Sequence, residues 1–116
     1  MSQIKIYHNP RCSKSRQTLQ LLQENGVNPE IIEYLKNTPS VSELSVIIKQ
    51  LSITPRELLR KKETAYKENN LSDASLSDAQ IIEAMYKNPS LIERPIVITE
   101  NKAVIGRPPE NALELL

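Results

Sequence analysis

The N-terminal residues alternate between apolar and polar side chains, which predicts a short buried strand. Ile4 and Ile6 flank Lys5, and alternation of this kind is typical of a strand with one face against a core. Asn9 and Pro10 end the strand, because a proline donates no ladder hydrogen bond and restricts the residue before it. A loop at these two residues therefore follows the first strand.

The next segment predicts a helix and a second strand. Residues 13–25 place Leu19 and Leu22 on one face, and Gly26 follows as a helix C-cap. Residues 29–35, with two adjacent isoleucines and a tyrosine, have the composition of a strand. A strand, a helix and a strand in this order predict a βαβ unit with parallel pairing.

Capping boxes predict three further helices in the middle of the chain. In such a box a Ser or Thr caps the first turn, and a Glu or Gln three residues later caps it in return. The three pairs are Ser40 with Glu43, Thr54 with Glu57, and Ser77 with Gln80. The apolar face of the first helix would comprise Val41, Leu44, Ile47, Ile48 and Leu51, the second helix would run through Leu58, Leu59 and Arg60, and the third would carry Ile81, Ala84 and Met85. Residues 61–75 are polar and predict an exposed helical turn and a mobile loop.

The C-terminal part predicts a β-hairpin and a last helix. Residues 96–99 and 103–105 form the two strands, and the helix after Pro109 carries Ala112, Leu113, Leu115 and Leu116. The element order predicts one α/β domain over residues 1–116: an open mixed sheet with helices on both faces and an all-helical insertion at about 40–88, between the second and third strands. Ligands of such sheets bind beyond the carboxyl ends of parallel strands, which is where Cys12 falls.

Composition and charge exclude several classes of function. A formal net charge of +1 gives no basis for binding nucleic acid or an anionic membrane, and the four tyrosines are too scattered for a stacking platform. No signal peptide or membrane-spanning run is recognisable, so we expect a cytoplasmic protein that is monomeric and holds no metal. A single cysteine cannot form an internal disulfide, so any redox cycle must use an external thiol.

Cys12 is the candidate nucleophile. It falls at or just before the start of the first predicted helix, where unpaired backbone N–H groups and the helix dipole favour a negative charge. This placement lowers the pKa of a thiol from about 8.5 into the range of roughly 3.5–7.5, and Arg11, Lys14 and Arg16 would act in the same direction. A lone cysteine is most often a small buried apolar residue, but the polar and charged neighbours argue against burial. We therefore expect a thiolate at neutral pH.

Four short motifs span the chain, and they read His8-Asn9-Pro10-x-Cys12-x-x-Ser15-Arg16-x-Thr18-Leu19, Thr54-Pro55-x-Glu57-Leu58-Leu59-Arg60, Glu93-Arg94-Pro95-Ile96 and Ile105-Gly106-Arg107-Pro108. Together they resemble the glutaredoxin-linked arsenate reductase family. The similarity extends over essentially the full chain, and the combination is more specific than any one motif. The resemblance implies a thioredoxin-like fold, in which the mixed sheet is flanked by helices.

The resemblance also implies how the substrate is bound. Cys12 would be the nucleophile, and Arg60, Arg94 and Arg107 would bind the oxyanion. Planar guanidinium groups suit this task because they bind tetrahedral oxyanions in bidentate fashion. Arg94 and Arg107 flank the two strands of the predicted hairpin, which should bring them close together.

Supporting roles follow from the same motifs. His8 would orient or protonate the thiol, and Pro95 would be a cis-proline facing the thiolate. Ser15 and Arg16 belong to the cysteine motif and would support the site.

The family resemblance implies reduction of arsenate to arsenite, for arsenic detoxification. Glutathione would be the co-substrate, glutaredoxin the protein partner, and no cofactor would be tightly bound. Two other functions stay open. The Cys-x-x-Ser spacing of Cys12 and Ser15 also fits a monothiol thiol–disulfide oxidoreductase. Transcription regulators that bind RNA polymerase share the fold, but they usually carry a Cys-x-x-Cys switch, which Ser15 precludes here.

Overall fold

The computed structural model describes residues 3–116, and its contacts divide the chain into two compact units. The sheet unit combines the described part of Met1–Asn37 with Arg94–Leu116, and the helical unit is Thr38–Glu93. The helical unit corresponds to the insertion predicted at about 40–88, and it extends a few residues further at each end.

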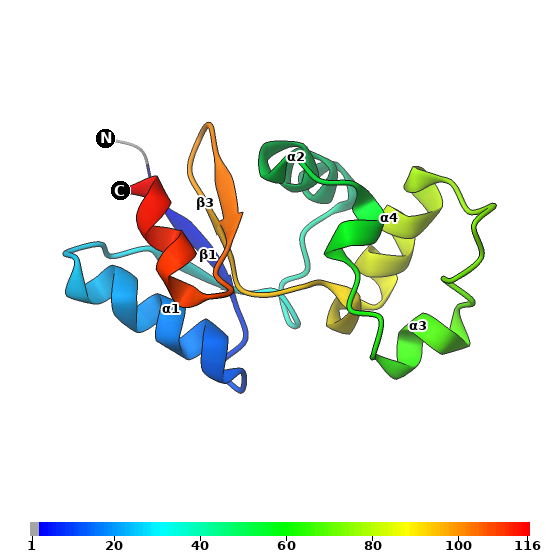
Figure 1. The fold of residues 1–116 in the computed structure, drawn as a ribbon, viewed down its shortest axis with the longest axis horizontal. Coiled ribbons are helices and arrows are strands. Elements are labelled where there is room, and N and C mark those ends of the chain that lie inside the picture. Colours follow the sequence, from blue (N-terminus) through cyan, green and yellow to red (C-terminus); the bar gives the residue numbers. More distant parts are fainter. Residues whose placement is uncertain (1–2) are drawn as a thin grey trace. The chain divides into compact units, whose positions relative to one another are not determined.

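A four-stranded mixed sheet forms the centre of the sheet unit (Figure 1). Its strands are β1 (Lys5–His8), β2 (Glu30–Glu33), β3 (Ile96–Ile98) and β4 (Ala103–Ile105), in the order β2-β1-β3-β4. β1 pairs in parallel with β2 and antiparallel with β3, and β3 pairs antiparallel with β4. The predicted βαβ unit and hairpin are both confirmed.

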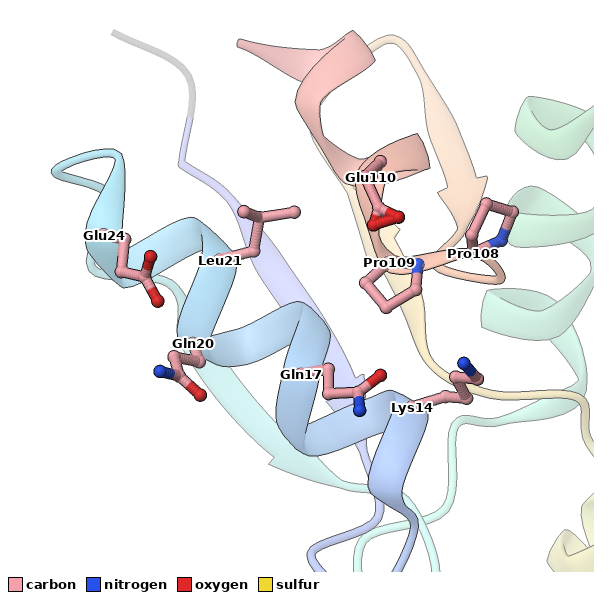
Figure 2. A pocket seen from close by; sticks show the side chains of 8 residues that line it. All are labelled: Lys14, Gln17, Gln20, Leu21, Glu24, Pro108, Pro109 and Glu110. Atoms are coloured by element: carbon pink, nitrogen blue, oxygen red, sulfur yellow. The ribbon is translucent and has the colours of Figure 1, made fainter.

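Two helices of the sheet unit pack against each other and against the sheet. They are α1 (Ser13–Glu24) and the 3-10 helix η3 (Pro109–Leu115). A groove of about 270 Å³ lies between them. The side chains that line it are shown in Figure 2, and they are Lys14, Gln17, Gln20, Leu21 and Glu24 of α1 and Pro108, Pro109 and Glu110 at the start of η3.

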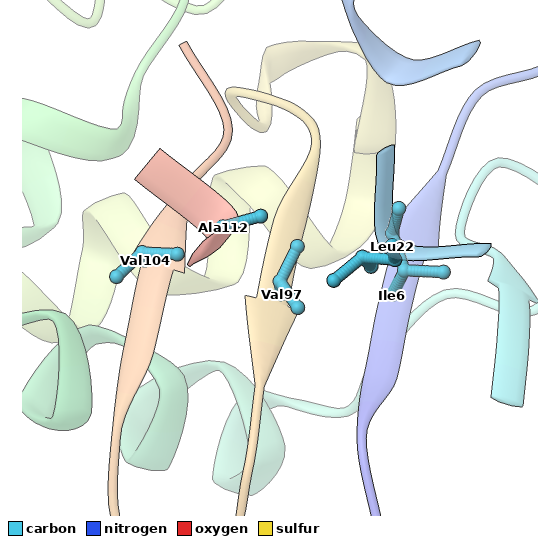
Figure 3. Packing of buried hydrophobic residues seen from close by; sticks show 5 residues of the cluster. All are labelled: Ile6, Leu22, Val97, Val104 and Ala112. Atoms are coloured by element: carbon cyan, nitrogen blue, oxygen red, sulfur yellow. The ribbon is translucent and has the colours of Figure 1, made fainter. Parts of the chain in front are cut away.

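A small apolar cluster joins these helices to the sheet (Figure 3). Ile6, Val97 and Val104 lie on the same face, because the register pairs Ile6 with Val97 and Val97 with Val104. Leu22 of α1 and Ala112 of η3 pack onto them, and all five side chains are buried. Burying a large apolar side chain contributes roughly 1.5–3 kcal/mol. The cluster therefore fixes α1 on the sheet, and with it the cysteine that precedes this helix.

α1 ends one residue earlier than the sequence predicted, so that its C-cap is Asn25 and Gly26 comes directly after the cap. Asn25 is the C-cap residue, and Gly26 adopts a φ of 79°, a left-handed conformation that glycine adopts without steric penalty. The N–H groups of Gly26 and Val27 donate to the carbonyls of Gln23 and Leu22, at 3.1 and 3.0 Å. These hydrogen bonds satisfy carbonyl groups of the last helical turn.

All three predicted capping boxes are present in the helical unit. Ser40 caps α2 (Val41–Leu51), Thr54 caps the 3-10 helix η1 (Pro55–Leu58) and Ser77 caps α4 (Asp78–Lys87). The unit also contains α3 (Thr64–Glu68) and the 3-10 helix η2 (Pro89–Leu91). Its buried residues include Leu44, Ile47 and Ile48 of α2 and Ile81, Ile82 and Met85 of α4. None of the helices formed between residues 3 and 116 is long and apolar enough to cross a membrane.

Two details of the helical unit differ from the sequence prediction. The helix opened by Thr54 stops at Leu58 and does not reach Arg60, because Leu59 is extended and pairs with Ile92. Val41, predicted on the apolar face of α2, is 40% exposed, so that face begins only at Leu44.

The polar stretch 61–75 contains the predicted helical turn, which is α3. The loop after it, predicted to be mobile, is anchored by an arginine from η1. The Arg56 guanidinium donates to the carbonyls of Leu71 and Asp73, at 2.8 and 2.6 Å. Leu71 is also buried. The loop is therefore tied to the body of the helical unit by polar and apolar contacts.

Candidate functional site

Cys12 lies between the end of β1 and the first turn of α1. Its extended backbone makes it the N-cap residue of α1, and its N–H donates to the Asn9 carbonyl at 3.0 Å. Its own carbonyl accepts the Arg16 N–H, also at 3.0 Å. The first N–H groups of α1 have no partner within the helix, so they are available to the sulfur. The predicted position of Cys12 at the helix start is confirmed.

The surroundings of Cys12 lower the pKa of its thiol below the ordinary value. Burial, the largest single effect, raises the pKa, and the residue is only 8% exposed. The backbone N–H of Ser15, the Arg94 guanidinium, the backbone N–H of Lys14 and the Arg107 guanidinium together outweigh it. Each of these groups stabilises the thiolate more than the thiol. The expectation that Cys12 is not buried is therefore wrong. A buried cysteine is nevertheless compatible with an ionised sulfur here, because these groups favour the thiolate.

The predicted contribution of backbone N–H groups at the helix start is confirmed, but the charged side chains that act on the sulfur differ from those predicted. The side chains of Arg11, Lys14 and Arg16 were expected to lower the pKa. Among the described residues, the side-chain charges that lower it are instead those of Arg94 and Arg107, and they act together with the two backbone N–H groups. The Arg16 guanidinium donates to the Pro10 carbonyl at 2.9 Å, which ties the loop before Cys12 to α1. Neighbours in sequence therefore shape the loop, and charges from the hairpin act on the sulfur.

The hairpin brings Arg94 and Arg107 to the same edge of the sheet. Ile96 of β3 pairs with Ile105 of β4, and the Gly106 N–H donates to the Pro95 carbonyl at 2.9 Å. The Arg94–Pro95 bond is cis, as the family resemblance implied, and the Arg107–Pro108 bond is also cis. Strand pairing thus brings together two arginines that are separated in sequence.

Gly106 permits a close approach between the hairpin and α1. A Cβ atom at this position would lie 2.6 Å from Thr18 Oγ1 and 2.9 Å from Pro95 Cγ. The Thr18 hydroxyl lies 2.8 Å from the Lys14 carbonyl and 3.2 Å from the Gly106 carbonyl, as a hydrogen-bond donor. Thr18 is fully buried. This contact sets the distance between Arg107 and the first turn of α1.

His8 and Ser15 form a buried polar pair beside the cysteine loop. His8 Nδ1 lies 2.6 Å from Ser15 Oγ, and this oxygen also accepts the Asn9 N–H at 3.0 Å. Burial lowers the pKa of His8, Glu33 raises it, Arg16 lowers it, and the net shift is downward. A neutral imidazole whose Nδ1 accepts the Ser15 hydroxyl hydrogen satisfies both groups. Ser15 therefore links His8 to the helix turn that faces the sulfur.

Arg60 belongs to the helical unit, whereas the other predicted site residues belong to the sheet unit. Its guanidinium pairs with Glu63 at 3.0 Å and with Glu93 at 3.9 Å. Its N–H donates to the Leu91 carbonyl at 2.8 Å. The assignment of Arg60 to the oxyanion stays a prediction. The sheet unit holds the others, Cys12, His8, Ser15, Arg16, Arg94, Pro95 and Arg107.

Sequence reasoning missed two groups near the site. Glu33, on the strand next to β1, raises the pKa of His8, and the Thr18 hydroxyl donates to the Gly106 carbonyl, next to Arg107. In the sequence, Glu33 was assigned only to a predicted strand, and Thr18 was one residue of the cysteine motif with no role of its own. Within residues 3–116 no group of three or more His, Cys, Asp or Glu side chains could hold a metal ion.

Replacing Arg94 or Arg107 by glutamine is expected to raise the pKa of Cys12, because either change removes a positive charge that favours the thiolate. The alkylation rate of Cys12 with iodoacetamide, measured against pH, should show its midpoint move upward by about 0.5–1 unit. The larger shift is expected for Arg94→Gln, whose charge has the larger effect. Cys12 is the chain's one cysteine, so the signal is unambiguous.

Arg11→Gln is the matched control for this experiment. It removes a guanidinium from the residue directly before Cys12 and should leave the midpoint in place. A midpoint that moved with Arg11 and not with Arg94 or Arg107 would contradict the geometry.

Comparison with known proteins places the chain in a family. The ArsC family model matches residues 7–115. Arsenate reductase of Haemophilus influenzae is 51% identical over 112 residues, which are 96% of this chain and 97% of that protein. The uncharacterized protein YfgD of Escherichia coli is 56% identical over 115 residues, or 98% and 97% of the two chains. The solved structure of an arsenate reductase from Vibrio cholerae aligns with a TM-score of 0.96 at 50% identity, covering 99% of this chain and 98% of that one. With its cysteine at the start of α1 and its paired arginines at the hairpin, this chain belongs to the ArsC family and has the thioredoxin-like fold of its structural relatives.

Proposed function

We propose that the protein reduces arsenate to arsenite through a covalent adduct on Cys12. The observation that carries this proposal is the lowered pKa of a sulfur that is influenced by two guanidinium groups, Arg94 and Arg107. A thiolate is a strong nucleophile, and guanidinium groups bind tetrahedral oxyanions. Relatives that this chain matches over nearly their full length are named arsenate reductases, and these names support arsenate as the oxyanion.

In the first step the Cys12 thiolate attacks arsenic and forms the S–As bond. One As–O bond breaks, and the oxygen leaves as water after taking up a proton. With dihydrogen arsenate the balance is one thiolate, one substrate anion and one proton, giving a singly charged thio-adduct and one water molecule. Arg94 and Arg107 would stabilise the negative charge on the arsenate oxygens as the bond forms. Arg60 is proposed as a third ligand on the family resemblance alone.

The second step needs a thiol from outside the chain, because Cys12 is its one cysteine. Glutathione is proposed as that thiol. Its sulfur attacks the Cys12 sulfur, the S–As bond breaks, and its electron pair stays on arsenic, which is thereby reduced to arsenite. Cys12 and glutathione are left as a mixed disulfide. A glutaredoxin thiolate then attacks the glutathione sulfur and releases the Cys12 thiolate.

The test is a coupled assay with arsenate, glutathione, glutaredoxin, glutathione reductase and NADPH. NADPH should be consumed only when the protein and arsenate are both present, and omission of glutaredoxin should slow the reaction strongly. Phosphate, a similar tetrahedral oxyanion, is the matched control and should give no consumption. Turnover of a glutathionylated test peptide without turnover of arsenate would favour a monothiol oxidoreductase instead.

A further inference from the structure

Glu33 lies beside His8 at the edge of the sheet that carries the site. In the parallel pairing of β1 with β2, the last residue of each strand is opposite the other, so that His8 pairs with Glu33. Both residues line a cavity of about 180 Å³, together with Asn9, Pro10, Arg11, Leu35 and Lys36. The imidazole is buried, whereas the Glu33 side chain is 42% exposed. A buried histidine and a half-exposed carboxylate thus occupy neighbouring positions at the wall of this cavity.

The Nδ1 atom of the His8 ring is hydrogen-bonded to Ser15. Its Nδ1 lies 2.6 Å from Ser15 Oγ, which already accepts the Asn9 N–H. The hydroxyl has one hydrogen, and neutral His8 can take it only if Nδ1 carries no proton. In that arrangement the ring proton is on Nε2, whereas an Nδ1–H that donated to the second lone pair of Ser15 Oγ would define the other tautomer. Any group that favours the Nε2–H tautomer therefore also fixes the orientation of the Ser15 hydroxyl. Ser15 belongs to the first turn of α1, whose N–H groups act on the sulfur.

The charged groups around His8 come from three parts of the sheet unit. Glu33 acts from β2 and raises the pKa of His8, and Arg16 acts from α1 and lowers it. Arg11 of the cysteine loop and Lys36 line the same cavity, and the Lys36 ammonium lies 3.7 Å from the Glu33 carboxylate. Glu33 is therefore the one carboxylate among these groups that can complement a ring N–H.

We propose that Glu33 is a positioning residue for the Cys12 site: its carboxylate holds the proton of His8 on Nε2, so that Nδ1 accepts the Ser15 hydroxyl. A carboxylate next to one ring nitrogen is a general means of fixing the tautomer and orientation of an imidazole. Ser15 then holds Asn9, whose carbonyl accepts the Cys12 N–H. The consequence for turnover rests on the proposed function, but the tautomer of His8 can be tested without it.

The direct test is NMR of the chain's one histidine. The ¹⁵N chemical shifts of its ring should identify the Nε2–H tautomer in the wild-type protein, and a titration should give its pKa. In Glu33→Gln, which keeps the shape and removes the charge, the titration midpoint should fall by about half a pH unit, and the Nδ1–H tautomer should become more populated. Glu33→Asp should restore most of the wild-type behaviour.

Glu30→Gln is the matched control, because Glu30 is an exposed carboxylate at the other end of β2, opposite Lys5. It should change neither the tautomer nor the midpoint. A wild-type His8 with its proton on Nδ1, or a Glu33→Gln midpoint equal to that of Glu30→Gln, would overturn the proposal.

Kinetics then separate this inference from the proposed function. In the arsenate assay, Glu33→Gln should reduce kcat by about three- to tenfold with little change in the KM for arsenate. The acid limb of its pH profile of kcat should move to lower pH by the shift measured by NMR, which a merely structural defect would not produce.

If wild type lacks arsenate turnover while the NMR results hold, the proposed function fails and the role of Glu33 toward His8 stands. If turnover is normal and His8 does not respond to Glu33→Gln, only the role of Glu33 fails.

Discussion

Cys12→Ser is expected to reduce arsenate turnover by at least about a thousandfold, to the background rate of the coupled assay. A serine hydroxyl is not ionised at neutral pH, so the N–H groups of Ser15 and Lys14 and the charges of Arg94 and Arg107 would have no thiolate to stabilise. The measurement is NADPH consumption with arsenate, glutathione and glutaredoxin. No other cysteine in the chain can replace the lost nucleophile.

Ser13→Ala is a suitable comparison for this variant. Ser13 is the next residue, exposed at the first position of α1, and its loss should leave turnover close to that of wild type. Circular dichroism should show that Cys12→Ser keeps its helices and its cooperative unfolding. Equal turnover of wild type and a folded Cys12→Ser variant would rule out the covalent mechanism.

Gly106→Ala is expected to destabilise the sheet unit by about 1–3 kcal/mol, because an added Cβ would overlap Thr18 Oγ1 at 2.6 Å and Pro95 Cγ at 2.9 Å. Relief of the overlap requires α1 and the hairpin to move apart, which displaces Arg107 from the helix start. The pKa of Cys12 should therefore rise as well. Urea unfolding gives the loss of stability, and the pH dependence of alkylation gives the change at the sulfur.

The other glycine of the chain provides the control. Gly26 also has a special backbone conformation, with a φ of 79°, but a Cβ there would meet nothing within 4 Å. Gly26→Ala should cost about 1 kcal/mol through the left-handed backbone alone and leave the alkylation midpoint unchanged. Combining Gly106→Ala with Thr18→Ala removes one of the clashing groups and should restore part of the midpoint shift. If Gly106→Ala changes neither stability nor alkylation, the close approach is not part of the site.

Local sequence rules were sufficient for most element boundaries and for the location of the candidate nucleophile. Ser40, Thr54 and Ser77 begin the predicted helical segments because a capping box satisfies backbone N–H groups within four residues of chain. Gly26 ends α1 for an equally local reason. Cys12 follows a strand-ending proline and precedes a helix, so its place at a helix start could be predicted without knowledge of the tertiary structure.

Tertiary structure decided which groups act on the sulfur. Arg11 and Arg16 are its neighbours in sequence, yet Arg94 and Arg107 lower its pKa, because the pairing of β3 with β4 brings them to the site. The sequence predicted this hairpin and the proximity of its two arginines, but the distances from their guanidinium groups to the sulfur depend on contacts between distant residues, which a local pattern does not contain. The same reason explains why Leu59 leaves the predicted helix to pair with Ile92.

The sequence by itself determined the position of the candidate nucleophile, the order of the elements and the family resemblance, since these depend on residue type and on spacing over a few positions. Only the tertiary structure decided that Gly106 must lack a side chain opposite Thr18 and that Glu33 lies beside His8. The physical reason is range: capping and turn formation act within one helical turn, whereas charge stabilisation and close packing depend on distances that only the folded chain sets.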